Sequence, residues 1–157
     1  MQDRIDLIIE TQPKITMVVA KSLSNSPGIA AELFSALGTK GFNIEMITQS
    51  IINDNTADIS FAIMSDDAQN AVEHLKTLSD LSIKEFILYP GMGILTVYAK
   101  GLSGIPGIAG KVFSILAKEG VNIEMISTSL SSISVLILEE YLAPSKNILD
   151  KELKLNA

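Results

Sequence analysis

The chain has 157 residues, a formal net charge of −6, a hydrophobic content of 47% and no cysteine. Because Lys and Arg form no cluster, we expect neither nucleic acid nor an anionic membrane surface as a partner, and the lack of cysteine excludes disulfides and thiolate chemistry. No apolar run approaches the ~20 residues that span a bilayer, and the N-terminus has no signal-peptide pattern, so we expect a cytoplasmic protein.

The first half of the chain shows the pattern of one β-α-β-β-α-β unit. Pro27 suits the first turn of one helix, and Ser65 suits the N-cap of a second helix. The strand-like segments, rich in β-branched and apolar residues, are residues 14–20, 42–52, 56–64 and 82–89. This order is the ferredoxin-like arrangement, in which two helices cover one face of an antiparallel sheet, so we expect an α+β fold.

The second half repeats the pattern with a shorter hairpin. Its predicted elements are a strand at 94–100, a helix at 107–119, a strand at 121–130 and a strand around Ile133. A last helix runs from about Glu139 towards Leu153 and is broken by Pro144.

This second unit lacks a fourth strand, whereas the strand-like residues 5–9 have no place in the first unit. We therefore expect an N-terminal strand at residues 4–10 to complete the second sheet. The predicted domains are residues 14–90, and residues 91–157 together with residues 4–10.

One sequence pattern occurs twice, 79 positions apart. The segments Pro27–Ser50 and Pro106–Ser129 are identical at 14 of 24 positions, and both contain Pro-Gly-Ile-Ala and Asn-Ile-Glu-Met-Ile. Such similarity indicates duplication of a folded unit. The period is too long for a solenoid, whose repeats run to roughly 20–50 residues.

The repeated Pro-Gly pair can mark an anion site at a helix start. The first N–H groups of a helix lack internal partners, and Gly28 or Gly107 would let a carboxylate approach them. Asn43 and Asn122, at the start of the following strand, offer amides that donate and accept, as an α-amino acid requires. The alternative is that Pro-Gly marks only a helix start and Asn only a turn; the residues alone leave both open.

The sequence contains no catalytic motif. The glycines 104, 107 and 110 match neither the dinucleotide fingerprint nor the P-loop, and His74, the only histidine, has no triad partner at a suggestive spacing. We expect no catalytic residue, no metal site and no cofactor. Glu45 and Glu124, inside the repeated strand, are expected to face solvent.

The two units resemble the tandem ACT-domain regulatory region of aspartate kinase. The resemblance lies in SNSPGIA…GFNIEMITQS of the first unit and in IPGIA…GVNIEMISTS…ISVL of the second, and residues 56–61 (TADISF) resemble the third strand of that family's first ACT unit. It implies a non-catalytic chain that binds threonine or lysine for allosteric feedback inhibition of a kinase that phosphorylates the aspartate side chain. It also implies a homodimer through ACT units, and an aspartate kinase catalytic chain as partner.

The resemblance further implies an effector site between ACT units. The implied effector-binding residues are Ser24, Asn25, Pro27, Gly28, Ile29, Ala30, Gln49, Asn122 and Ile123. The corresponding second entrance comprises Ile105, Pro106, Gly107, Ile108, Ala109, Asn43 and Ile44.

Two departures distinguish this chain from that family. Asn25-Ser26 replaces a common Asp-Lys before the first Pro-Gly, and Gly104-Ile105 replaces a common Ser-His before the second. The two entrances are therefore not expected to be equivalent. The alternative function is an ACT-type assembly module that dimerises and scaffolds a partner enzyme without sensing an amino acid.

Overall fold

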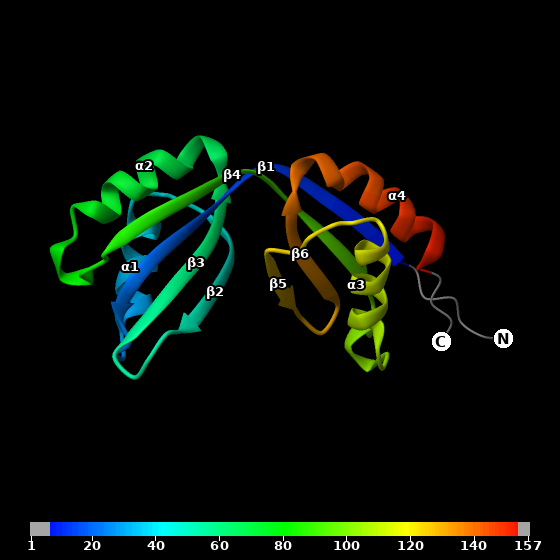
Figure 1. Cartoon of the computed structure of the whole chain (residues 1–157), viewed down its shortest axis with the longest axis horizontal. Helices are drawn as coiled ribbons and strands as arrows, with labels where there is room; N and C mark the ends of the chain where they lie inside the picture. The colour runs from blue at the N-terminus through cyan, green and yellow to red at the C-terminus, as the bar shows by residue number, and fades with distance from the viewer. Residues whose placement is uncertain (1–6, 154–157) are drawn as a thin grey trace. The chain divides into compact units, whose positions relative to one another are not determined.

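The computed structural model describes residues 7–153, which form two compact units. The first unit comprises Lys14–Pro90, and the second combines the described residues up to Pro13 with those from Gly91 onward. Residues 4–6 of the predicted N-terminal strand lie outside the described residues. Figure 1 shows the elements: β1 (Leu7–Ser24), α1 (Ile29–Thr39), β2 (Ile44–Ile51), β3 (Thr56–Met64), α2 (Ser65–Lys76), β4 (Glu85–Ala99), α3 (Ile108–Lys118), β5 (Met125–Thr128), β6 (Ser132–Leu138) and α4 (Leu142–Glu152).

The strands follow the order β2-β3-β1-β4-β6-β5, and β3 pairs antiparallel with β1 and β2 as β6 does with β4 and β5. β1 and β4 are neighbours, and each continues from one unit into the other. β2 is an edge strand of the first unit, and β5 is an edge strand of the second.

The prediction of separate strands at 4–10, 14–20, 82–89 and 94–100 was wrong, because β1 and β4 are continuous. Pro13 and Pro90 interrupt the sequence pattern where β1 passes from the second unit into the first and where β4 passes from the first unit into the second. The residue after each proline has a positive φ, 59° at Lys14 and 73° at Gly91. The backbone therefore changes direction there without ending the strand.

The first unit has its core between one face of its strands and two helices. Side chains from β1 and β3 meet side chains from α1 and α2, and Phe34 packs edge-on against Phe61 with ring centroids 5.8 Å apart. The most deeply buried members of this core are Leu23, Leu33, Leu37, Phe61, Ile63 and Leu81. The helical and strand periods predicted from the sequence account for these positions.

The second unit takes its core from β4, β6, α3 and α4, with β1 added. Ile9 of β1 is 3% exposed and belongs to the same buried cluster as Val97 and Leu149. Nζ of Lys146 in α4 donates a hydrogen bond to the carbonyl oxygen of Ile9. The N-terminal strand therefore completes the second unit, as predicted.

Several helix ends differ from the prediction. Pro27 precedes α1 by two residues, and Gly28 is the N-cap. Ser65 is the first residue of α2, and its hydroxyl pairs with Thr16 Oγ1 at 2.9 Å instead of capping the helix. Pro144 does not break α4, because it lies in the first turn, where no backbone N–H is needed.

Two elements of the second unit also differ from the prediction in length. β5 is restricted to Met125–Thr128, shorter than the predicted strand at 121–130. A single 3₁₀ turn, Glu139–Tyr141, precedes α4.

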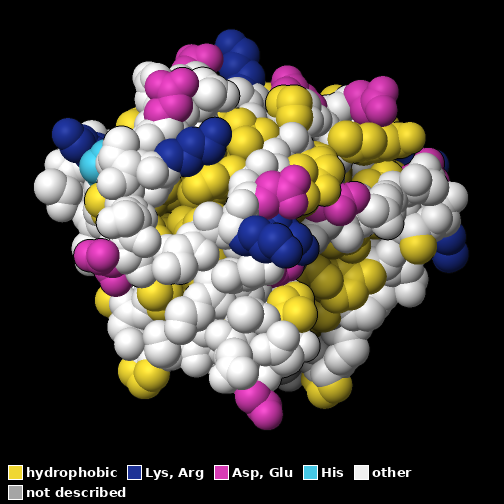
Figure 2. Space-filling model, turned by 60° about the vertical axis from the view of Figure 1, so that its left-hand side comes forward, with side chains coloured by type: hydrophobic (Ala, Val, Ile, Leu, Met, Phe, Trp, Pro, Cys, Tyr) yellow, Lys and Arg dark blue, Asp and Glu magenta, His cyan; other side chains and the backbone are white. Residues whose placement is uncertain are grey.

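No helix within residues 7–153 is long and apolar enough to cross a membrane. On the face shown in Figure 2, Lys side chains are interspersed with acidic and hydrophobic ones. That face therefore has no continuous area of one charge.

Candidate functional site

The two repeated helix entrances have the same backbone geometry. Gly28 is the N-cap of α1 with φ 94°, and Gly107 is the N-cap of α3 with φ 79°. Both values lie in the left-handed region that glycine adopts without steric cost, which explains the repeated glycine. No side chain caps either helix. The first-turn N–H groups are thus open to a ligand, apart from those of Ile29 and Ile108, which donate to carbonyl oxygens three residues earlier.

A pocket of about 320 Å³ lies at the entrance of α3, within the second unit. It is lined by Leu102, Ser103, Ile105, Pro106, Gly107, Ile108, Ala109, Thr128, Ser129 and Ile133. The structure thus brings together the five second-entrance residues at positions 105–109. Its lining is apolar with three hydroxyl groups and no charged side chain.

Sequence reasoning missed Ser103, Thr128 and Ser129 as lining residues. The signal was present in the repeat, because Thr128 occupies the position of Gln49 in the other copy, 79 residues away. The hydroxyl of Ser129 already has partners within the chain. It pairs with the hydroxyl of Ser132 at 2.7 Å and accepts the N–H of Ser132 at 3.1 Å. Ser103 and Thr128 are exposed at the pocket.

The first entrance is a loop fastened to the β2–β3 turn. Ser24, the last residue of β1, pairs with Thr56, and the N–H of Asn25 donates to the carbonyl oxygen of Asn55 at 2.8 Å. The hydroxyl of Ser24 donates to that of Ser26 at 3.1 Å. Beyond this anchor the residues from Ser26 to Gly28 are exposed.

Of the remaining predicted residues, Ile44 and Gln49 lie on β2 and Asn43 directly precedes it, whereas Asn122 and Ile123 lie in the loop before β5 and not at the start of a strand as predicted. Gln49 is exposed on β2 and pairs with Ile59. Asn122 and Ile123 belong to the second unit, and Asn43 and Ile44 belong to the first. Each predicted set therefore draws residues from both units.

The two repeated asparagines make the same local contact. Nδ2 of Asn43 donates to Oε1 of Glu45 at 3.3 Å, and Nδ2 of Asn122 donates to Oε1 of Glu124 at 2.6 Å. Glu124 is exposed as expected, whereas Glu45 is half-buried. Because each glutamate occupies the amide N–H₂ group, the amide oxygen is left as the acceptor that an ammonium group requires.

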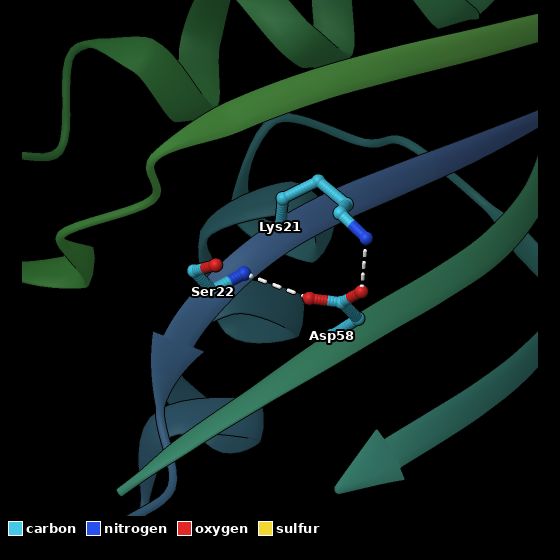
Figure 3. A network of polar contacts seen from close by, with 3 residues as sticks. All are labelled: Lys21, Ser22 and Asp58. Atoms are coloured by element: carbon cyan, nitrogen blue, oxygen red, sulfur yellow. Dashed lines mark hydrogen bonds and ion pairs between the residues drawn. The ribbon is translucent and has the colours of Figure 1, made fainter. Parts of the chain in front are cut away.

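An ion pair that sequence reasoning missed stands just before the first entrance (Figure 3). Nζ of Lys21 lies 2.5 Å from Oδ2 of Asp58, and the N–H of Ser22 donates to Oδ1 of Asp58 at 2.9 Å. Burial acts to raise the pKa of Asp58, but the hydrogen bonds from Lys21 and Ser22 and the attraction of the Lys21 ammonium outweigh it, so the pKa lies below 3.8. The hydrogen bond to Asp58 likewise raises the pKa of Lys21 above 10.5.

The sequence profile described as ACT domain matches residues 16–78 and 95–153, one match in each half of the chain. The chain belongs to the ACT-domain family. Among curated relatives, the aspartokinase of Pseudomonas aeruginosa is 32% identical over 138 residues, which cover 87% of this chain and 34% of the relative. The aspartokinase of Corynebacterium glutamicum is 33% identical over 149 residues, 93% of this chain and 35% of the relative. The ACT chain thus spans about a third of the length of these relatives.

Solved structures extend the similarity over nearly the whole ACT chain. The ligand-free regulatory subunit of aspartate kinase from Thermus thermophilus superposes with a TM-score of 0.86 at 29% identity, covering 97% of this chain and 100% of that one. A structure of aspartokinase alpha and beta subunits gives a TM-score of 0.84 at 28% identity, covering 94% and 97%. The resemblance to the tandem ACT regulatory region of aspartate kinase is therefore confirmed.

Proposed function

We propose that this chain is the amino-acid-binding regulatory part of an aspartate kinase, which senses threonine or lysine and conveys feedback inhibition. The observation that carries the proposal is the pocket at the α3 entrance, which gathers the residues at 105–109 around an uncapped helix start. The similarity to regulatory subunits over the full chain supports it. In this proposal residues 14–90 are one ACT domain, and residues 91–157 with 4–10 are the other.

The proposed recognition uses one group for each part of an α-amino acid. Open N–H groups in the first turn of α1 or α3 take the carboxylate, where the positive end of the helix dipole adds to the attraction. The resemblance assigns the ammonium group to Asn122 or Asn43, each of which donates an amide N–H to a neighbouring glutamate, Glu124 or Glu45. The effector-binding residues of the first entrance and the residues at 105–109 are those assigned by the resemblance.

The lining of the pocket favours threonine over lysine at the α3 entrance. Its hydroxyl groups, at Ser103, Thr128 and Ser129, can pair with the hydroxyl of a threonine side chain. A lysine side chain would bring an ammonium group into a lining that contains no carboxylate, and an unpaired charge is costly to desolvate.

Phosphoryl transfer to aspartate is assigned to a partner kinase chain, and this chain acts by changing its own conformational equilibrium. An effector shifts that equilibrium only by its differential affinity for the two states. The proposed assembly is a homodimer through ACT units. Its support is the pair of edge strands: Ile47 and Ile51 on β2 are 51% and 70% exposed, and the matching positions Ile126 and Leu130 are 46% and 80% exposed.

The same exposed residues favour the second candidate, an assembly module without a sensing role. Exposed apolar edge strands suit pairing with another chain whether or not an amino acid binds. Asn25 and Ile105, which stand where the family commonly has charged or polar residues, also favour it.

A matched pair of substitutions tests the sensing proposal. Ala109→Leu fills the α3 pocket, and Ala30→Leu makes the same change at the same position of the α1 entrance. Threonine should raise the unfolding temperature of the unaltered chain by mass action, and each substitution should reduce the part of that shift that arises from threonine at its own entrance. A chain whose unfolding temperature rises with protein concentration but ignores threonine and lysine would support the assembly module instead.

A further inference from the structure

β1 contains a bulge immediately before the loop of the first entrance. The pairing of β1 with β3 changes register between Ala20 and Leu23, so that Lys21 and Ser22 together face the single residue Asp58. Figure 3 shows both side-chain oxygens of Asp58 directed at this bulge, one to Lys21 and one to the backbone of Ser22. Asp58 is only 8% exposed. A buried carboxylate with two specific donors fixes the backbone it contacts.

Ser22 has a backbone conformation that serine rarely adopts. Its φ is 59°, in the left-handed region where a side chain crowds the backbone. Such a residue keeps this conformation only when its surroundings hold it there. Two contacts hold the peptide between Lys21 and Ser22: the N–H of Ser22 donates to Oδ1 of Asp58 at 2.9 Å, and the carbonyl oxygen of Lys21 accepts the N–H of Lys84 at 3.0 Å.

In the second copy of the repeat, the residue with a positive φ is a glycine instead of a serine. The sequence Ala-Lys-Ser-Leu-Ser at residues 20–24 becomes Ala-Lys-Gly-Leu-Ser at residues 99–103, so Gly101 occupies the position of Ser22. Gly101 also has a positive φ, 73°, which glycine adopts without help. Gly101 lies in a turn after the end of β4, and Ser132, which matches Asp58 in the sequence, has no carboxylate, faces Tyr98 and pairs with Ser129.

We propose that Asp58 is a positioning residue for the effector loop: its carboxylate holds Ser22 in the left-handed conformation and thereby sets the direction in which Leu23 to Gly28 leave β1. The inference rests on the proposed function, because that function makes this loop a binding element. Leu23 is fully buried directly after Ser22, and Ser24 is exposed next to it. Ser24 and Asn25 are in turn paired with Thr56 and Asn55, so no flexible linker separates Ser22 from the loop.

Asparagine cannot replace Asp58 in this role. The amide oxygen could accept the N–H of Ser22, but the N–H₂ group would then face the ammonium of Lys21, and two donors cannot pair. Asp58→Asn therefore removes the fixed conformation while nearly preserving side-chain volume. In Ser22→Gly, the residue adopts a positive φ without requiring the hydrogen bond to Asp58.

The test combines Asp58→Asn and Ser22→Gly, alone and together, in the full chain. Asp58→Asn should weaken threonine binding at the first entrance by about tenfold and speed amide hydrogen exchange at residues 23–28. Ser22→Gly alone should change neither by more than about twofold, and it should restore both in the double variant. Lys100→Met, at the position that matches Lys21 in the second copy, is the control and should leave exchange at residues 23–28 unchanged.

Each outcome bears on a different claim. If the unaltered chain binds no threonine but exchange at residues 23–28 rises in Asp58→Asn and falls again in the double variant, the proposed function fails and the positioning role of Asp58 stands. Unchanged exchange in Asp58→Asn would overturn the positioning role. A loss that Ser22→Gly does not rescue would also overturn it, because Asp58 would then act through general stability alone.

Discussion

Lys146 of α4 donates a hydrogen bond to the backbone carbonyl oxygen of Ile9, a residue 137 positions earlier in the chain. This contact ties the N-terminal part of β1 to the helix that covers the second unit. Lys146→Met keeps the apolar stem but removes the bond, and it should lower the free energy of unfolding by about 1 kcal/mol. Denaturant unfolding would measure the change, with the exposed Lys151→Met on the same helix as control. Equal effects of the two variants would argue against a role of Lys146 in holding β1.

Gly93 is required by the close approach of α4 to β4. A Cβ at this position would lie 2.4 Å from a methyl carbon of Leu142, a distance that real Cβ atoms do not show. Gly93→Ala should therefore destabilise the chain by about 1–3 kcal/mol, and Leu142→Ala should recover part of that loss in the double variant.

Gly38 offers the matched control, because a Cβ there meets nothing within 4 Å and the residue lies inside α1. Gly38→Ala should stabilise the chain by about 0.5–1 kcal/mol through helix propensity. Thermal unfolding of Gly93→Ala and Gly38→Ala would measure the two effects on stability. A destabilisation by Gly38→Ala as large as that by Gly93→Ala would mean that close packing is not the reason for glycine at position 93.

The ion pair of Lys21 and Asp58 predicts a pH dependence of stability. The pKa of Asp58 is lower in the folded chain than its ordinary 3.8, so the unfolded state binds the proton more readily. The contribution of Asp58 is therefore present above about pH 4 and is lost as pH falls through the folded pKa. Glu85 and Tyr89 also act on Lys21 and are retained in every variant.

Urea unfolding between pH 2 and pH 6 would measure this dependence in the unaltered chain and in Asp58→Asn. The variant should be less stable near neutral pH, and the difference should shrink as the solution becomes acidic. A difference that stays constant over that range would contradict the assignment of the pKa shift to this pair.

The hydroxyl groups of the α3 pocket give a prediction about selectivity. Thr128→Val keeps the shape of the side chain and removes its hydroxyl, so it should weaken the binding of threonine by about threefold to tenfold. Valine as a ligand should lose little by the same substitution, because it has no hydroxyl to pair. Competition titrations of threonine and valine against both proteins would measure the two effects. Equal losses of affinity for both ligands would show that the Thr128 hydroxyl does not contact the hydroxyl of threonine.

The repeat and its periodicities predicted the ferredoxin-like units because helix and strand positions are decided by local patterns that occur twice. Continuity of β1 and β4 was not predictable in that way. Pro13 and Pro90 break the local pattern, yet β1 and β4 continue through them, with a positive φ at Lys14 and at Gly91. The role of the N-terminal strand was predictable, because the second unit lacked a strand.

The candidate site was predictable where it depends on the chain's own repeat and not where it depends on long-range contacts. Gly28 and Gly107 could be placed from sequence because a helix start is local. The contacts of Asp58 could not be predicted from the sequence, because they depend on a bulge in β1 that places two residues opposite Asp58. The difference between Ser22 and Gly101 is visible when the two halves of the sequence are compared. Its structural reason becomes clear only from the backbone angles, because both residues have a positive φ.

The central claim is that this ACT chain binds an amino acid, and isothermal titration of the full chain with threonine and lysine tests it most directly. We expect saturable binding of threonine that Ala109→Leu weakens, and weaker binding of lysine at the α3 entrance. A folded chain that takes up neither amino acid at millimolar concentration would contradict it.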